Sequence, residues 1–289
     1  MSSFQPTPTA PPTFDTLMKA YCASLVTNFF FYPYRDYVKI YVARWPPEFP
    51  QPSFVVYRYR GFAENPLQLL LISGMTASLY GGFVGGGGAA SGAVLGGVLH
   101  GTSKSALRML GTRMTATKRN GEARFLSITD CVRIMTQERG AWSWFCGSSA
   151  NILISMSWHG AALASLESRD RRRPSFFSDW WDAFRTHAFL NFVTCPIRNT
   201  FRSSVSAVER SGGVRSASEF FSGEAAVFRE AGAVAPAMLK TVGLPFFLQG
   251  CVRTTFKASI PFGFTYALYR TVGGVLDGNT HRRFPRASY

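Results

Sequence analysis

Two short stretches of the chain place an arginine where it could bind an anion. NFFFYPYR at 28–35 and NFVTCPIR at 191–198 share the pattern N-F-x-x-x-P-x-R. In each, a second base follows four residues after the arginine, as Lys39 and as Arg202. A guanidinium fork with another base nearby suits a phosphate or another multiply charged anion. Two copies of one uncommon pattern also indicate an internal repeat.

The other residues that could do chemistry form no recognisable site. The 16 acidic residues and the serines show no Ser/His/Asp or Cys/His grouping at local spacing, so we expect no catalytic residue and no enzyme activity. Five cysteines without C-x-x-C spacing indicate small buried side chains in a reducing compartment. The four histidines lack metal-ligand spacing, so no metal is expected. They are His100, His159, His187 and His281.

A glycine-rich stretch at 81–97 invites comparison with a phosphate-binding loop. Glycines have the right spacing there, but Thr102 stands where a Walker loop needs lysine, and no strand precedes it. We therefore expect a tight turn and close helix–helix contact through small residues. The residues concerned are Gly92 with Gly96 and Gly97 with Gly101.

The composition indicates a membrane protein with basic loops. Of the 289 residues, 46% are hydrophobic and only 16% are charged, against about 25% charged in typical soluble domains. The net charge is +15, yet the bases are scattered, and the one dense cluster is RDRRR at 169–173. Nucleic-acid binders carry denser basic patches, so no nucleic-acid partner is expected. Membrane proteins with basic loops combine these features.

Six stretches approach the length of a membrane-spanning helix, which is about 20 residues. None is as apolar as an isolated spanning helix, which suits a bundle whose helices turn a polar side inward. A soluble all-helical protein is the alternative. Residues 1–13 lack the pattern of a secretory signal, and their Pro and Thr content indicates an extended leader. The six stretches are 14–42, 64–84, 92–117, 149–168, 180–208 and 246–275.

The six stretches form three pairs of similar sequence. The first members share a Pro-x-Arg or Ala-x-Arg triplet that begins at Pro33, Ala106 and Pro196. Proline removes a hydrogen bond of the helix, so we expect kinks at Pro33 and Pro196. The pattern predicts a threefold helix-pair repeat. The second members share a glycine near their start and a Tyr or Leu near their end, at Tyr80, Leu166 and Tyr269.

The order and spacing of these motifs resemble the mitochondrial carrier family. YRGF at 59–62 is similar to the family's glycine box, MTQERGAWSWFCG at 135–147 to its matrix helix and glycine box, and KASIPFGFTYALYR at 257–270 to its sixth helix. The resemblance implies an all-α membrane protein with six transmembrane helices in three pseudo-threefold helix-pair repeats. It also implies a multi-pass location in the mitochondrial inner membrane. The repeats would occupy 14–91, 92–178 and 179–276, between the leader 1–13 and a tail at 277–289.

The segment that joins the two helices differs between repeats. The second and third repeats carry helical segments near 126–139 and 216–231, at the places of the family's matrix helices. In the first repeat the sequence WPPEFPQPSF at 45–54 is too rich in proline to form a helix. We expect it to be an extended strap that lies along a partner.

The chain departs from the family at the matrix gate. Carriers place an acid near the end of each first helix, and these acids pair with bases to close the matrix side. Here the three positions hold Arg35, Arg108 and Arg198, so the gate chemistry is inverted. Together with Lys39 and Arg202, at least two of them are expected to contact a phospholipid headgroup, such as cardiolipin, or an acidic segment of a partner. The alternative is that the helix ends splay and each arginine faces water.

The cytosolic gate of the family is degenerate as well. Tyr80 and Tyr269 keep its aromatic positions, but Glu167 is the one acid that fits. Arg270 is the base that could pair with Glu167, and Asp170 stands where a base belongs. One ion pair is too little for a cooperative gate.

The resemblance also implies substrate contacts on the second helix of each pair. These positions are Gln68, Ile154 with Ser155, and Lys257. Carriers of anionic substrates usually keep a base at the third contact, as Lys257 does here. The alternative is that Lys257 pairs with a carboxylate or snorkels toward water.

Two functions follow from the resemblance. With both gates degenerate, we expect a carrier-fold protein that no longer transports and is an accessory subunit of a respiratory-chain or ATP-synthase assembly, because the family includes such recruited members. The alternative is an active solute carrier for a small anionic metabolite. No cofactor is expected beyond structural cardiolipin or another anionic phospholipid. The expected partners are membrane lipid and other subunits of the complex.

Overall fold

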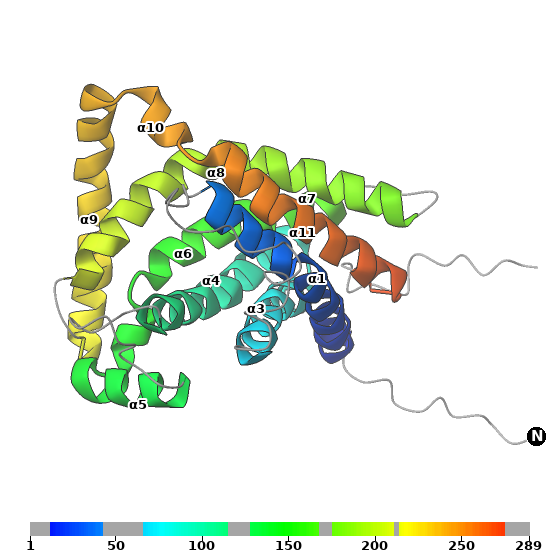
Figure 1. Ribbon diagram of the computed structural model, residues 1–289, viewed down its shortest axis with the longest axis horizontal. Helices are drawn as coiled ribbons and strands as arrows, with labels where there is room; N and C mark the ends of the chain where they lie inside the picture. The colour runs from blue at the N-terminus through cyan, green and yellow to red at the C-terminus, as the bar shows by residue number, and fades with distance from the viewer. Residues whose placement is uncertain (1–11, 43–65, 115–127, 168–174, 211–213, 275–289) are drawn as a thin grey trace, which may run out of the picture. The chain divides into compact units, whose positions relative to one another are not determined.

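The chain is helical throughout its described part. The computed structural model describes residues 12–42, 66–114, 128–167, 175–210 and 214–274, and these ranges contain no strand. The expectation of an all-α protein is therefore confirmed for these residues. Figure 1 labels the helices in chain order.

Each of the six predicted stretches coincides with a helix or with consecutive helices. The first three are α1 (Pro12–Val42), α3 (Pro66–Gly85) and α4 (Ala89–Met114). The fourth is α6 (Ser148–Ser155), the π-helical turn η2 (Met156–Gly160) and α7 (Ala161–Glu167). The last two are α8 (Phe176–Arg210) and α11 (Cys251–Thr271). Within the described ranges, none of these helices has both the length and the apolarity needed to cross a membrane.

The two predicted connecting helices are also present. α5 (Ile128–Arg139) ends where expected, and α9 (Ala217–Thr241) begins at a capping box formed by Ser216 and Glu219. α9 runs beyond the expected end at 231 and continues through Pro236. A short helix follows each of them: η1 (Ala141–Phe145) comes after α5, and α10 (Leu244–Leu248) comes after α9. α1 and α8 likewise continue through Pro33 and Pro196, and the kinks there stay predictions.

The chain divides into two compact units, and the boundaries between them fall inside helices. Unit 1 comprises Met1–Gly96, His159–Phe189 and Arg253–Tyr289. Unit 2 comprises Gly97–Trp158 and Leu190–Val252. Each unit thus takes residues from more than one predicted repeat.

Glycines let helices approach closely in both units, as predicted. In unit 1, a Cβ on Gly96 would lie 2.5 Å from the carbonyl oxygen of Leu79, so α4 contacts the backbone of α3. In unit 2, a Cβ on Gly101 would lie 2.5 Å from the Cα of Ile152, so α4 contacts α6. Neither position has room for a larger residue. The small residues of the glycine-rich stretch therefore function in helix packing, and that prediction is confirmed.

Two connections in unit 2 have the same backbone. Gly140 and Gly147 bracket η1 with φ of 83° and 74°, and Gly243 and Gly250 bracket α10 with φ of 78° and 69°. The residue before the second glycine is extended in both, with φ −53°, ψ 129° at Cys146 and φ −56°, ψ 127° at Gln249. Such positive φ values favour glycine. We call residues 140–147 the second corner and residues 243–250 the third corner.

Candidate functional site

The predicted substrate-contact position on α6 is sealed by packing. Ser155 is fully buried, and Ile154 is 5% exposed. The Oγ of Ser155 lies 3.0 Å from Nδ1 of His100 on α4, within the same unit. One turn earlier, Asn151 Nδ2 donates to Ser105 Oγ at 2.8 Å. This face of α6 is therefore hydrogen-bonded to α4.

The other two predicted contact positions belong to unit 1. Lys257 lies half-buried on α11. Gln68 lies in the first turn of α3, and its side chain is outside the described part of the chain. The structure therefore describes the surroundings of one predicted contact, Ser155, in detail.

Arg198, at one inverted gate position, is held by neutral groups. Its Nη1 donates to Oδ1 of Asn191, and its Nη2 donates to Sγ of Cys195 at 3.0 Å. Its Cζ lies 5.4 Å from the ring centroid of Trp158, which is a cation–π contact. Asn191 and Cys195 precede Arg198 on α8, so the guanidinium lies back along its own helix. These contacts fix the guanidinium without neutralising its charge.

Unit 2 gathers further bases around Arg198. The charge of Lys104 on α4 interacts with those of Arg198 and Arg108, and the charge of Arg198 interacts with that of Arg202. The structure thus brings together Arg108, Arg198 and Arg202 of the predicted anion site. It adds Lys104, which the motif comparison missed although Lys104 and Arg108 are spaced four apart, as are Arg198 and Arg202.

The remaining bases of the predicted anion site are on α1. Arg35 and Lys39 belong to this helix, but their side chains lie outside the described part. The side chain of Pro33 also lies outside the described part. Whether these bases contact an anion stays a prediction.

Two tyrosines of the predicted cytosolic gate pack together in unit 1. Tyr80 on α3 and Tyr269 on α11 are both fully buried, and their ring centroids are 4.9 Å apart. The end of α11 beside them is a Schellman turn, in which Gly274 N donates to Tyr269 O and Gly273 N donates to Arg270 O. Aromatic packing therefore joins α3 and α11 here.

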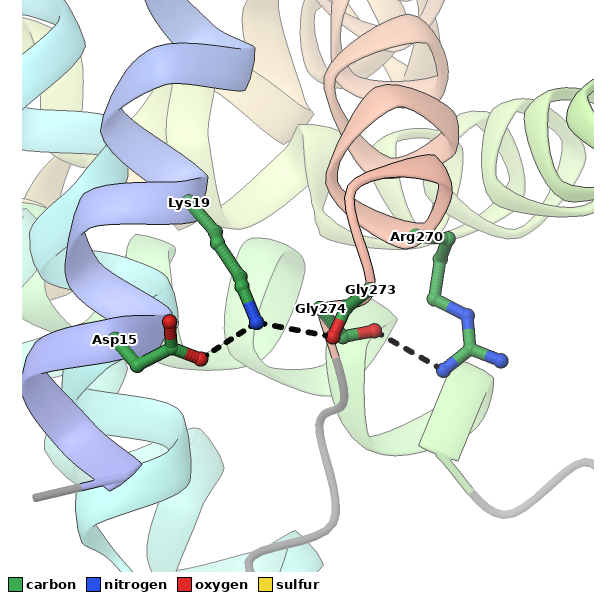
Figure 2. Close-up of polar contacts among 5 residues, drawn as sticks. All are labelled: Asp15, Lys19, Arg270, Gly273 and Gly274. Carbon is green, nitrogen blue, oxygen red and sulfur yellow. Dashed lines mark hydrogen bonds and ion pairs between the residues drawn. The ribbon is translucent and has the colours of Figure 1, made fainter. Parts of the chain in front are cut away.

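The bases at this end of unit 1 cap the C-terminus of α11. Figure 2 shows Arg270, whose Nη1 donates to the carbonyl oxygen of Gly274 at 3.3 Å. Lys19 on α1 pairs with Asp15 at 2.6 Å and donates to the carbonyl oxygen of Gly273 at 3.3 Å. Carbonyls at a helix C-terminus attract such cations.

Of the two acids at the predicted cytosolic gate, the structure describes Glu167. Glu167 is the last residue of α7 and is half-buried. Asp170 lies outside the described residues. The pair of Glu167 with Arg270 stays a prediction.

Two histidines of unit 1, the half-buried His159 and the fully buried His187, form a pair that the sequence motifs did not predict. Nδ1 of His159 lies 2.8 Å from Nε2 of His187, and Nδ1 of His187 lies 2.9 Å from Oγ of Ser259. The ring of Phe262 stacks on His187 with centroids 4.0 Å apart. The residues come from η2, α8 and α11, so no local spacing could reveal them. In the described ranges, no group of three His, Cys, Asp or Glu side chains could hold a metal ion.

Polar side chains are buried in both units while large apolar ones are exposed. Asn28 is 2% exposed, and its Nδ2 donates to Ser73 Oγ at 3.0 Å, which joins α1 to α3. Asn191 is fully buried, and its Nδ2 donates to the carbonyl oxygen of Cys251 at 3.2 Å. By contrast, Phe177 and Phe189 of α8 are 78% and 67% exposed. Single exposed apolar residues are ordinary, but here they recur along the helices.

Comparison with known proteins assigns no family to the chain. No family model matches it, and no curated protein matches it. The resemblance to mitochondrial carriers stays a prediction from the motifs.

Proposed function

We propose that the chain is a carrier-fold protein of the mitochondrial inner membrane that no longer transports. It is an accessory subunit of a respiratory-chain or ATP-synthase assembly. One observation carries the proposal: Ser155, at a predicted substrate contact, is fully buried and lies 3.0 Å from His100. A contact residue of a working carrier has to face a cavity that water and substrate enter. A side chain bonded to the neighbouring helix cannot do so.

The distribution of polar and apolar side chains supports a membrane location. Asn28, His187 and Asn191 are buried and hydrogen-bonded inside their units. Membrane helices bury such groups because hydrocarbon offers them no hydrogen bond. Apolar side chains such as Phe177 and Phe189 are left outside, where lipid would cover them.

Recurring contacts support the three helix-pair repeats. In each predicted repeat, one asparagine amide joins the first helix to the second. The bonds are Asn28 to Ser73, Asn151 to Ser105, and Asn191 to Cys251. The shared backbone of the second and third corners adds a second repeated feature.

The state of the gate positions supports the loss of transport. A transporting gate breaks and re-forms its ion pairs in each cycle. Arg198 is instead fixed by Asn191, Cys195 and the ring of Trp158. In unit 1, Tyr80 and Tyr269 are packed without exposure to solvent. Side chains held in this way stabilise one conformation and do not break and re-form contacts as a gate does.

Native electrophoresis tests the subunit role. Inner membranes from cells that make the chain are dissolved in a mild detergent and separated, and the chain is detected by an antibody or a tag. We expect it to migrate with a large respiratory-chain or ATP-synthase complex. A transporting carrier of the same membrane, detected in the same lane, is the control. Migration near the 31.9 kDa mass of the single chain would overturn the proposal.

The half-buried base Lys257 favours a second candidate, a carrier of small anions. Reconstitution in liposomes separates the two functions. We expect no exchange of nucleotides, carboxylates or phosphate above that of empty vesicles. Saturable uptake that Lys257→Ala abolishes, and that Lys240→Ala on the exposed face of α9 leaves intact, would restore the carrier.

A further inference from the structure

Four bases of unit 2 lie on two helices, with the same spacing of four residues on each. Lys104 and Arg108 are one turn apart on α4, and Arg198 and Arg202 are one turn apart on α8. Residues four apart on a helix lie on one face. The charge of Lys104 interacts with those of Arg108 and Arg198, and that of Arg198 with that of Arg202. The four positive charges therefore form one group.

Arg198, the central base of the group, is held in place by contacts within the protein. Arg198 donates to Asn191 and Cys195 on its own helix and lies over Trp158. Two of its five N–H donors are used in this way, which leaves the fork oriented with further donors. Lys104, Arg108 and Arg198 are half-buried, and Arg202 is exposed. The group thus reaches from the interior of unit 2 to its surface.

Like charges gathered in a half-buried place repel each other more strongly than they would in water. Each base raises the electrostatic free energy of its neighbours in the group, and one multiply charged anion lowers it for those it contacts. Free phosphate carries up to two charges, and cardiolipin carries one on each of its two phosphodiesters; their several acceptor oxygens match guanidinium forks and an ammonium. A carboxylate carries one charge and serves fewer of these donors.

We infer that Lys104, Arg108, Arg198 and Arg202 form a binding site for a phosphate group, carried by a lipid headgroup or free in solution. The inference stands on unit 2 alone, and it holds whether or not the chain transports. It names Lys104 as a ligand that the motif comparison did not assign. Arg202, at the exposed end, is where the group enters.

Binding to the purified full chain tests the site. The chain is delipidated in a neutral detergent, and its thermal midpoint is measured with pyrophosphate, with cardiolipin micelles, with phosphatidylcholine micelles and with polyglutamate. We expect pyrophosphate or cardiolipin to raise the midpoint, because a ligand that binds only the folded state stabilises it. Stabilisation by both means that free phosphate suffices, and stabilisation by cardiolipin alone identifies a headgroup. Stabilisation by polyglutamate alone, or by phosphatidylcholine equally, would overturn the inference.

Variants separate this site from general attraction between charges. The double variant Lys104→Gln/Arg108→Gln should bind the stabilising probe at least about tenfold more weakly, since two of four charged donors are lost. Arg229→Gln/Lys240→Gln removes the same charge from exposed positions of α9 and should bind like wild type. Equal binding by both double variants contradicts the site.

A second variant and a second readout guard against simple misfolding. Arg202→Gln changes an exposed residue and should weaken binding about threefold, because only the entry base is lost. Without any probe, Lys104→Gln/Arg108→Gln should keep a midpoint close to that of wild type, because relieved repulsion offsets the contacts that the two side chains lose. A much lower midpoint without probe would mean that these bases hold the fold together, and would overturn the inference.

Discussion

The second and third corners of unit 2 share a backbone but are stabilised by groups of opposite polarity. At the second corner, the carboxylate of Glu224 accepts from the backbone N–H of Gly147 at 2.5 Å and of Ser149 at 2.9 Å, and also from the Ser149 hydroxyl. At the third corner, Nδ2 of Asn199 donates to three carbonyl oxygens at 2.9–3.2 Å, those of Phe246, Phe247 and Gln249. One corner needs an acceptor and the other a donor.

The corners also differ in packing. A Cβ on Gly140 would lie 2.5 Å from the carbonyl oxygen of Val214, and Cys146 packs against Val214 and Met109. At the third corner, a Cβ on Gly250 would meet nothing within 4 Å, and Leu244 is 70% exposed. The glycines thus determine the path of the backbone at both corners, while the side chains packed around them differ. Both corners expose apolar side chains, and the more exposed one is at the third corner, where Leu244 is 70% exposed against 41% for Trp142 at the second.

The largest expected effect comes from replacing the first glycine of each corner. Gly140 (φ 83°, ψ 157°) and Gly243 (φ 78°, ψ −164°) are in a region that is nearly exclusive to glycine. Gly140→Ala should cost about 4 kcal/mol, because strain adds to a clash with the backbone of Val214. Gly243→Ala should cost about 2 kcal/mol, from strain alone.

The loss of stability in the two glycine variants is measured by thermal unfolding, with the labelling of cysteine thiols as the readout. Cys131, Cys146, Cys195 and Cys251 are buried and become reactive on unfolding, while the exposed Cys22 gives the baseline. Equal losses for Gly140→Ala and Gly243→Ala would show that packing does not distinguish the corners.

The next effect tests the polarity of the third corner. Asn199→Asp keeps the shape of the side chain but sets carboxylate oxygens against three carbonyl oxygens. It should lower the free energy of unfolding by about 3 kcal/mol, from lost bonds and a poorly solvated charge. Asn199→Ala, which removes the donor and adds no charge, should cost about half as much. If Asn199→Asp is the milder of the two, the assignment of the amide nitrogen is wrong.

A smaller effect is expected at the second corner. Glu224→Gln replaces a charged acceptor at the N-terminus of α6 by a neutral one and should cost about 1–2 kcal/mol. Glu230→Gln, which like Glu224 is on α9, is the matched control, with an expected change within about 0.5 kcal/mol. Hydrogen exchange of the Gly147 and Ser149 amides provides the local readout. Unchanged protection of both amides in Glu224→Gln would argue against the contact.

The smallest effect is expected where the third corner is open. Gly250→Ala should cost about 1 kcal/mol, because a left-handed residue with a Cβ is strained even without a clash. Gly147→Ala has the same strain and also a contact of 2.5 Å to Cγ1 of Val205, so its midpoint should fall further. A larger fall for Gly250→Ala would reverse the comparison.

Local pattern was enough to predict the helices but not their contacts. Apolar runs between proline- and glycine-rich stretches predicted α1, α8 and α11 close to their bounds. The glycine pairs of α4 were predictable too, because small residues four apart have few other uses. The end of α9 was not predictable in this way, since the helix continues past residue 231 and through Pro236.

Two of the missed residues, Glu224 and Asn199, have partners that are distant in sequence. Glu224 contacts residues 75–77 positions earlier, and Asn199 contacts carbonyls 47–50 positions later. Lys104 was overlooked because it stands one turn before the motif position at Arg108. Contacts of this kind follow from tertiary packing, which a single sequence does not display.

The histidine pair of unit 1 links the hydrogen-bond donors of three helical elements: His159 on η2, His187 on α8 and Ser259 on α11. At 2.8 Å the two facing nitrogens share a single hydrogen. When that hydrogen belongs to His159, the neutral His187 keeps its own on Nδ1 and donates to Ser259; when it belongs to His187, Nδ1 accepts from the Ser259 hydroxyl. The tautomer of one ring therefore dictates that of the other and the direction of the hydroxyl. A hydrogen that moves at the half-buried end, on η2, changes the fully buried end on α11 with no movement of the backbone.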